Sequence, residues 1–106
     1  MSSPFTSSSN SSSGDSESFR EEVHEFTYAY VKGGGDIAAF RRGVAAIGQK
    51  YGISSWEDDK LVLRSIGEGM GEAGLEKSKA RDMAADLFEN DPDKIAQVRK
   101  GYDAAR

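Results

Sequence analysis

The stretch GGGDIAAFRRGVAAIGQKYG, residues 33–52, decides which fold class the sequence predicts. Three consecutive glycines are costly in a helix, so glycines 33–35 should end one helix, and Asp36 offers a carboxylate to cap the next. After Asp36 the apolar residues recur on one helical stripe, which comprises Ile37, Phe40, Val44, Ile47 and Tyr51. The stretch therefore predicts a helix break followed by an amphipathic helix.

Upstream of these glycines the sequence divides into a tail and a helix. Residues 1–18 contain ten serines and only one sizeable aromatic residue, Phe5. Such a segment buries too little apolar surface to offset a backbone entropy loss of about 1–2 kcal/mol per residue, so we expect a disordered tail at 1–18. From Phe19 apolar residues have helical spacing, and Ser18 with Glu21 has the form of a capping box. We expect a domain over 19–106 whose first helix covers about 18–31.

Downstream, three further helices are expected. The first should include Trp56 and end near Ile66 or Met70, because four glycines then follow, which we interpret as a flexible joint at 67, 69, 71 and 74. The next helix should cover about 75–89. Asp91 followed by Pro92 is a strong start signal for the last one. The sequence thus predicts an all-α, compact bundle of four to five short helices.

The composition argues against an enzyme. The chain has 106 residues, no cysteine and one histidine, His24, so neither a thiolate nucleophile nor a metal held by two imidazoles can be built. Its carboxylate clusters lie in the first turns of expected helices, where solvated acids are stabilising. Residues 69–74 read G-x-G-x-x-G, but Glu68 and Glu72 would repel a pyrophosphate and no βαβ unit is evident. We therefore predict no catalytic residue, no cofactor and no metal.

The sequence also bears on localisation. No apolar stretch approaches the roughly 20 residues that span a bilayer, so we expect a soluble protein with no membrane partner. Residues 1–18 lack the basic start and apolar core of a secretory signal peptide. Their serine-rich composition resembles the export signals of bacterial type III secretion substrates. We therefore expect a protein that is cytoplasmic or is secreted without a Sec signal peptide.

Aromatic residues suggest how a small helical domain would meet another protein. A domain of this size seldom covers all of its large apolar side chains, and aromatics with a polar edge suit an interface. The candidate partner-binding residues are Tyr28, Tyr51, Trp56 and Tyr102. The main functional prediction is a non-enzymatic protein-protein interaction module, either a bacterial secreted effector or a small adaptor or regulator, with an unidentified protein partner.

Residues 80–102 support an alternative. Small residues at Ala84 and Ala85, a short turn, and Ile95 and Val98 beyond it resemble a helix-turn-helix. The turn departs from that family, which usually has glycine followed by an apolar residue there. The resemblance implies a DNA-binding regulator whose groove-facing residues would be Lys94, Gln97, Arg99 and Lys100. Nucleic acid is not the favoured partner, because a phosphate would meet the carboxylates of Asp86, Glu89, Asp91 and Asp93.

Overall fold

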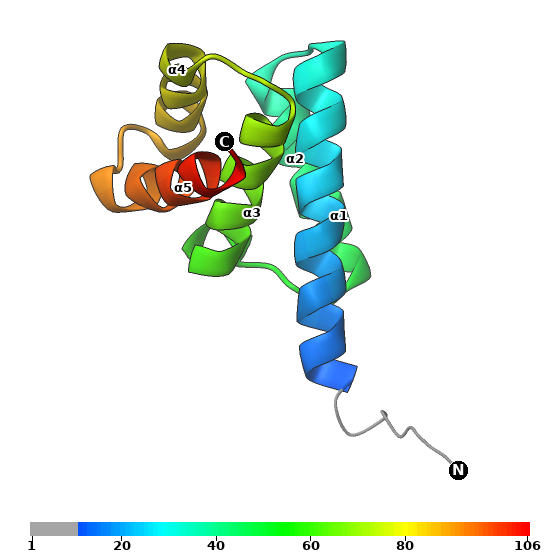
Figure 1. Cartoon of the computed structure of the whole chain (residues 1–106). Helices are drawn as coiled ribbons and strands as arrows, with labels where there is room; N and C mark the ends of the chain where they lie inside the picture. The colour runs from blue at the N-terminus through cyan, green and yellow to red at the C-terminus, as the bar shows by residue number, and fades with distance from the viewer. Residues whose placement is uncertain (1–10) are drawn as a thin grey trace.

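The computed structural model describes residues 11–106, with side chains placed from residue 16 onward, as helices joined by short connections (Figure 1). Within that range there is no β-strand, and the predicted all-α bundle is confirmed. In chain order the elements are α1 (Ser11–Gly33), α2 (Ile37–Lys50), the short 3-10 helix η2 (Trp56–Asp58), α3 (Lys60–Glu72), α4 (Lys77–Phe88) and α5 (Pro92–Ala105).

The first helix begins earlier than expected. We predicted its start at Ser18, whereas α1 begins at Ser11. The prediction rested on the first apolar side chain and on the capping pattern, and a helical backbone can extend beyond both. Among side chains from residue 16 onward, Phe19 is the first that is buried, at 1% exposure. Residues 1–10 of the predicted tail lie outside the described residues.

The connection between α1 and α2 follows the chemistry of its sequence. Gly34 and Gly35 adopt φ values of 83° and 144°, a region that side-chain-bearing residues rarely occupy. Asp36 then caps α2, because its Oδ1 accepts a hydrogen bond of 2.7 Å from the backbone N–H of Ala39. Both the predicted break and the predicted cap are confirmed. The result is that α2 folds back on α1, with Phe40 stacked on Phe26 at a centroid distance of 5.3 Å.

The third helix lies at the centre of the bundle, between α1 and α5 (Figure 1). Its buried side chains join the core from several directions around the helix: Val62, Leu63, Ile66 and Met70. The start of α3 differs from the prediction, since Trp56 lies before it in η2 and Asp59 is the cap, with Oδ1 2.9 Å from the backbone nitrogen of Leu61. Trp56 instead packs edge-on against Phe88 of α4 at 6.1 Å.

The glycine-rich segment is not the flexible joint that the sequence predicted. Gly67, Gly69 and Gly71 are buried inside α3, which continues to Glu72. A Cβ atom on Gly67 would collide with the Val98 carbonyl oxygen of α5. On Gly69 it would lie 2.7 Å from the His24 carbonyl oxygen of α1. These glycines let two neighbouring helices approach the backbone of α3, and this packing outweighs their poor helix propensity.

The last two helices are joined by a tight left-handed turn. Glu89 and Asn90 have φ values of 53° and 62°, so the chain reverses without a glycine. Asp91 then caps α5 by accepting from the backbone N–H of Asp93 at 3.0 Å, and Pro92 occupies the first helical turn as predicted. Just before this turn, the Arg41 guanidinium of α2 donates to carbonyl oxygens in the last turn of α4. These contacts fix the end of α4 next to the start of α5.

Candidate binding groove between α4 and α5

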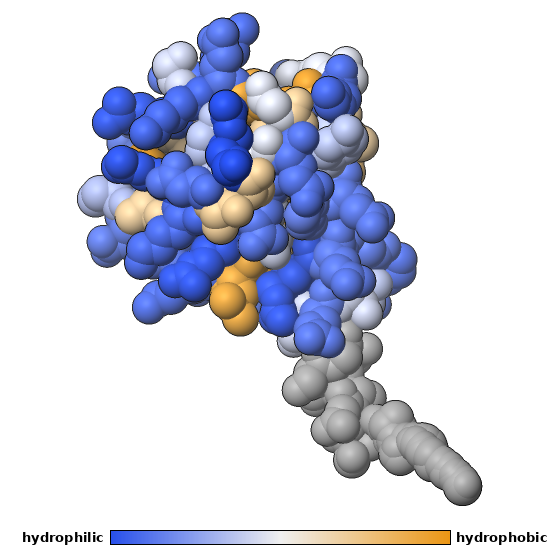
Figure 2. All heavy atoms as spheres, viewed as in Figure 1, coloured by the Kyte–Doolittle hydropathy of each residue, from blue (hydrophilic) through white to orange (hydrophobic). Residues whose placement is uncertain are grey.

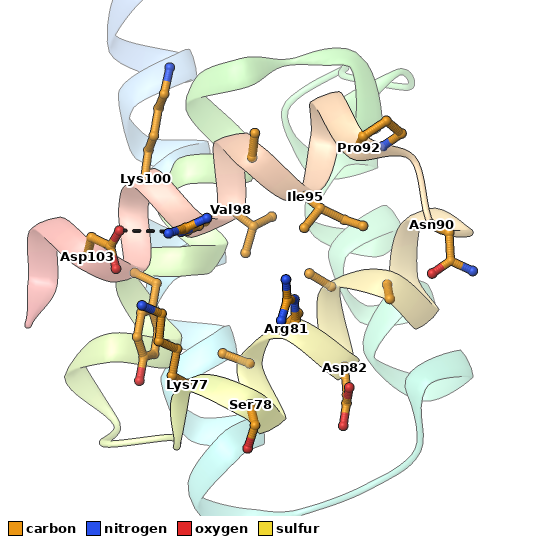
Figure 3. Close-up of a pocket in the computed structure, with 16 residues that line it drawn as sticks. Lys77, Ser78, Arg81, Asp82, Asn90, Pro92, Ile95, Val98, Lys100 and Asp103 are labelled. Carbon is orange, nitrogen blue, oxygen red and sulfur yellow. Dashed lines mark ion pairs between the residues drawn. The ribbon is translucent and has the colours of Figure 1, made fainter.

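A groove of about 1100 Å³ lies between α4 and α5 (Figure 3). Its floor is apolar: Ala80, Ala84 and Val98 are almost fully buried, and Ile95 is partly buried against the core. Figure 2 shows that the surface over these helices is otherwise mostly hydrophilic, with small apolar patches between polar side chains. An apolar floor with polar edges is typical of a binding site.

The groove stays open because the side chains facing it are short. Ala80, Ala84 and Ala85 line it from α4, and Ala96 lines it from α5. The turn at residues 89–90 directs α5 across α4 rather than back along it (Figure 1). The two helices therefore touch over a short length only, and methyl groups do not fill the space where they diverge.

The α4 edge of the groove is basic. Lys77 and Arg81 are both exposed and lie four residues apart on α4, which places them on the same face. Figure 3 shows the Arg81 guanidinium directed into the space between the helices, whereas Asp82 points away from it. Among the side chains described, neither Lys77 nor Arg81 forms an ion pair. This edge thus carries two cations that no described carboxylate pairs with, although Asp82 also lines the groove.

The α5 edge is closer to neutral. Arg99 lies 3.8 Å from a carboxylate oxygen of Asp103, one turn further along α5. Lys100 also lines the groove, but the ammonium end of its side chain extends away from α4 in Figure 3. The positive character of the groove therefore comes mainly from α4, in a chain whose formal net charge is −4.

The structure separates the four candidate partner-binding aromatics. Tyr28 is 40% exposed on α1, and the partly buried Tyr51 packs on Phe19 at 6.0 Å. Trp56 and Tyr102 are core residues, at 3% and 5% exposure. The Tyr102 hydroxyl donates to the Leu75 carbonyl oxygen at 2.6 Å, and Tyr102 is also among the residues that line the groove. Trp56 and Tyr102 therefore hold helices together rather than present a free aromatic face.

The candidate nucleic-acid contacts also fall into two groups. Lys94 lies 3.5 Å from a carboxylate oxygen of Asp58 in η2, and Gln97 accepts a 3.0 Å hydrogen bond from Arg64 of α3. These two side chains tie α5 to its neighbours. Arg99 and Lys100 line the groove instead. The four residues do not share one free face of α5.

Both ring nitrogens of His24 lie close to carboxylates of the neighbouring helix α3. Its Nδ1 lies 3.5 Å from Glu68 and its Nε2 lies 3.0 Å from Glu72, both carboxylates belonging to α3. The two carboxylates approach opposite sides of the ring, so they cannot share one ion with it. No group of three acidic or imidazole side chains in the described part of the chain is arranged to hold a metal. The histidine links α1 to α3 beside the close contact at Gly69.

Sequence reasoning missed Lys77 and Arg81, and a signal for them existed. The four-residue spacing of these cations, interleaved with Ala80 and Ala84, places a basic edge beside a stripe of small residues. Those alanines are expected on the inner face of the helix, and the expectation gave the neighbouring cations no role. In the structure both alanines are buried as expected, at 6% and 1% exposure, and Lys77 and Arg81 are exposed beside them.

Comparison with known proteins returns no relative. The chain matches no protein-family model, and neither the curated proteins nor the solved structures contain a match. Among residues 11–106, no helix combines the length and the apolar composition needed to cross a membrane. What the chain does must therefore be argued from its own groove and charges.

Proposed function

We propose that this protein is a protein-protein interaction module, and that the groove between α4 and α5 receives a segment of its partner. The observation that carries this proposal is the concave apolar lining of the groove, to which Ala85, Ile95 and Ala96 contribute accessible surface. Burying an apolar side chain there would remove surface from water on both partners, which is the main driving force of most protein associations.

The shape of the groove favours a protein segment as its occupant. It is open along its length, and a helix laid into an apolar groove uses a few anchors spaced along one face. An effector or adaptor role is compatible with this proposal. The expectation of secretion without a Sec signal rests on residues 1–18, of which only 11–18 are described, as the start of α1.

DNA binding remains the second candidate. It is favoured by the arrangement of α4, a tight turn and α5, with Arg99 and Lys100 on the last helix. Against it, Lys94 and Gln97 are engaged with other elements, and the groove is hollow where a duplex would need a protruding helix. Asp103 would also face an approaching phosphate from the α5 edge.

A selection from a displayed library of random peptides tests the proposal. The native protein is the bait. The Ala96→Trp variant is tested in parallel, because a tryptophan at this exposed position on the α5 edge should block the groove. Ala45→Trp serves as the matched control, because Ala45 is equally exposed on α2 and lies outside the groove. We expect enriched peptides to bind the native protein and the Ala45→Trp variant but not the Ala96→Trp variant.

Other outcomes contradict the proposal. If enriched peptides bind Ala96→Trp as well as the native protein, the partner surface is elsewhere. If nothing is enriched and random duplex DNA binds with a steep salt dependence, the second candidate takes its place.

A further inference from the structure

We infer that the groove selects an acidic amphipathic helical segment, one that places apolar side chains on the floor and carboxylates against Lys77 and Arg81. This inference rests on the proposed function and names the chemistry of the partner. It is carried by charge complementarity, because these two cations border the apolar floor and have no ion-pair partner among the described side chains.

The spacing of the two cations suits a helical partner. Residues four apart on α4 lie about 6 Å apart along the helix axis and on the same side of it. Two carboxylates four residues apart on a partner helix have the same separation. A helix lying alongside α4 can therefore meet Lys77 and Arg81 with successive turns while its neighbouring face contacts the partly exposed Ala85.

In the unbound protein the two cations on the α4 edge destabilise each other slightly. Two like charges at this spacing repel each other, and Asp82 of α4, which also lines the groove, forms no ion pair with either of them. A carboxylate bound beside each cation offsets that repulsion and adds an attractive contact. The α5 edge offers less, because Arg99 already has Asp103 at 3.8 Å.

The overall charge of the chain does not oppose a short acidic segment. A formal charge of −4 repels acidic partners at long range. At physiological ionic strength, however, charges more than about 8 Å apart are largely screened, so the contacts at the groove decide the outcome. A duplex is different, because its phosphates extend past the groove to the acidic residues around it, among them Glu89 and Asp93. The same basic edge thus favours a short acidic helix over DNA.

Three matched peptides of about sixteen residues test the inference. Each has the same leucines at i, i+3 and i+7, and two positions four residues apart beside them are both Glu, both Gln or both Lys. Binding to the native protein is measured by fluorescence anisotropy. We expect the Glu peptide to bind about tenfold more tightly than the Gln peptide, with the Lys peptide weakest, and the preference to shrink as salt rises.

Variants locate the preference. Lys77→Gln combined with Arg81→Gln should reduce the preference for the Glu peptide to within about twofold while the Gln peptide binds as before. The control is Arg42→Gln combined with Lys79→Gln, which removes the same charge from exposed residues outside the groove and should keep the preference.

The outcomes separate this inference from the proposed function. If all three peptides bind equally and Ala96→Trp still abolishes binding, the groove is a docking site and the acidic preference is wrong. If the control pair removes the preference as fully as the groove pair, the inference is also wrong, because net charge explains it. If no peptide binds and duplex DNA does, both fail.

Discussion

Helix α5 meets two neighbours in opposite ways. Toward α3 the contact is closed: Gly67 lies against the backbone of α5, and Gly101 lies against the Arg64 carbonyl of α3. Toward α4 the contact is open, with a groove floored by Ala84 and edged by Arg81. Both interfaces use small residues, yet only one is sealed. Glycine on both helices permits backbone contact, whereas alanine on both leaves a gap that neither helix can close.

The largest expected effect on stability comes from disrupting the close contact between α3 and α5. Gly67→Ala adds a Cβ that would collide with the Val98 carbonyl oxygen, which is backbone and cannot turn aside. Overpacking of this kind costs about 1–3 kcal/mol or more, and the better helix propensity of alanine returns only about 1 kcal/mol. We expect a net loss in the free energy of unfolding of about 1–2 kcal/mol, measured by urea denaturation.

A matched glycine provides the control for that experiment. Gly33 ends α1, and a Cβ there would meet nothing within 4 Å. Gly33→Ala should leave the urea midpoint unchanged or slightly raised. An equal loss in both variants would show that backbone conformation, and not the contact with α5, is what Gly67 provides.

The next effect concerns the turn at residues 89–90, which sets the angle between α4 and α5. Glu89 has a φ of 53°, and the left-handed region costs a side-chain-bearing residue about 1–2 kcal/mol. Glu89→Gly relieves this cost but increases the entropy of the unfolded chain. We expect a net stabilisation of about 0.5–1 kcal/mol by thermal denaturation, with the turn unchanged. A destabilised variant would mean that the Glu89 side chain contributes more than its backbone strain costs.

The open side itself should tolerate a large residue. Ala96 is exposed at the groove edge, so Ala96→Trp displaces water rather than protein atoms. We expect the free energy of unfolding to change by no more than about 0.5 kcal/mol, as for most surface substitutions. A loss comparable with that of Gly67→Ala would show that the groove is as tightly packed as the α3 contact, and the comparison would fail.

The smallest effect lies away from both interfaces. The Lys50 ammonium donates to both carboxylate oxygens of Glu22, at 2.8 and 3.0 Å, and with a further hydrogen bond from Tyr51 it lowers the pKa of Glu22 below the ordinary 4.5. A lowered folded-state pKa contributes stability above pH 4.5 that is lost as the pH falls through the folded value.

Glu22→Gln should therefore reduce the melting temperature slightly at pH 7, and the difference from the native protein should be smaller at pH 3. Paired thermal denaturation curves at the two pH values check this. A difference that persists undiminished at acidic pH would assign the effect of Glu22 to something other than its charge.

Local chemistry predicted most of the fold, and long-range packing explains where prediction failed. The caps at Asp36 and Asp91 depend on side chains next to the backbone that they serve, so the sequence was sufficient to find them. The glycines of α3 were misread because their helical cost is local, whereas the compensating contact with α5 joins residues such as Gly67 and Val98 that are distant in sequence.

Prediction of the candidate site also required contacts between residues that are distant in sequence. The expected aromatics Trp56 and Tyr102 are buried, since each fills space between helices whose arrangement the sequence did not reveal. Lys77 and Arg81 could have been identified as a basic edge from their spacing. Their place beside an apolar groove follows only once α5 is known to cross α4 (Figure 1).

The glycines inside α3 also affect the order in which the molecule assembles. Three interior glycines, each costing about 1 kcal/mol relative to alanine, leave this segment with little helical tendency of its own. Its helix should form only as α1 and α5 dock on either side of it. During synthesis α1 and α2 can pair as a hairpin, while the central helix waits until α5 has emerged from the ribosome. The core therefore closes in a single late event that joins both ends of the domain.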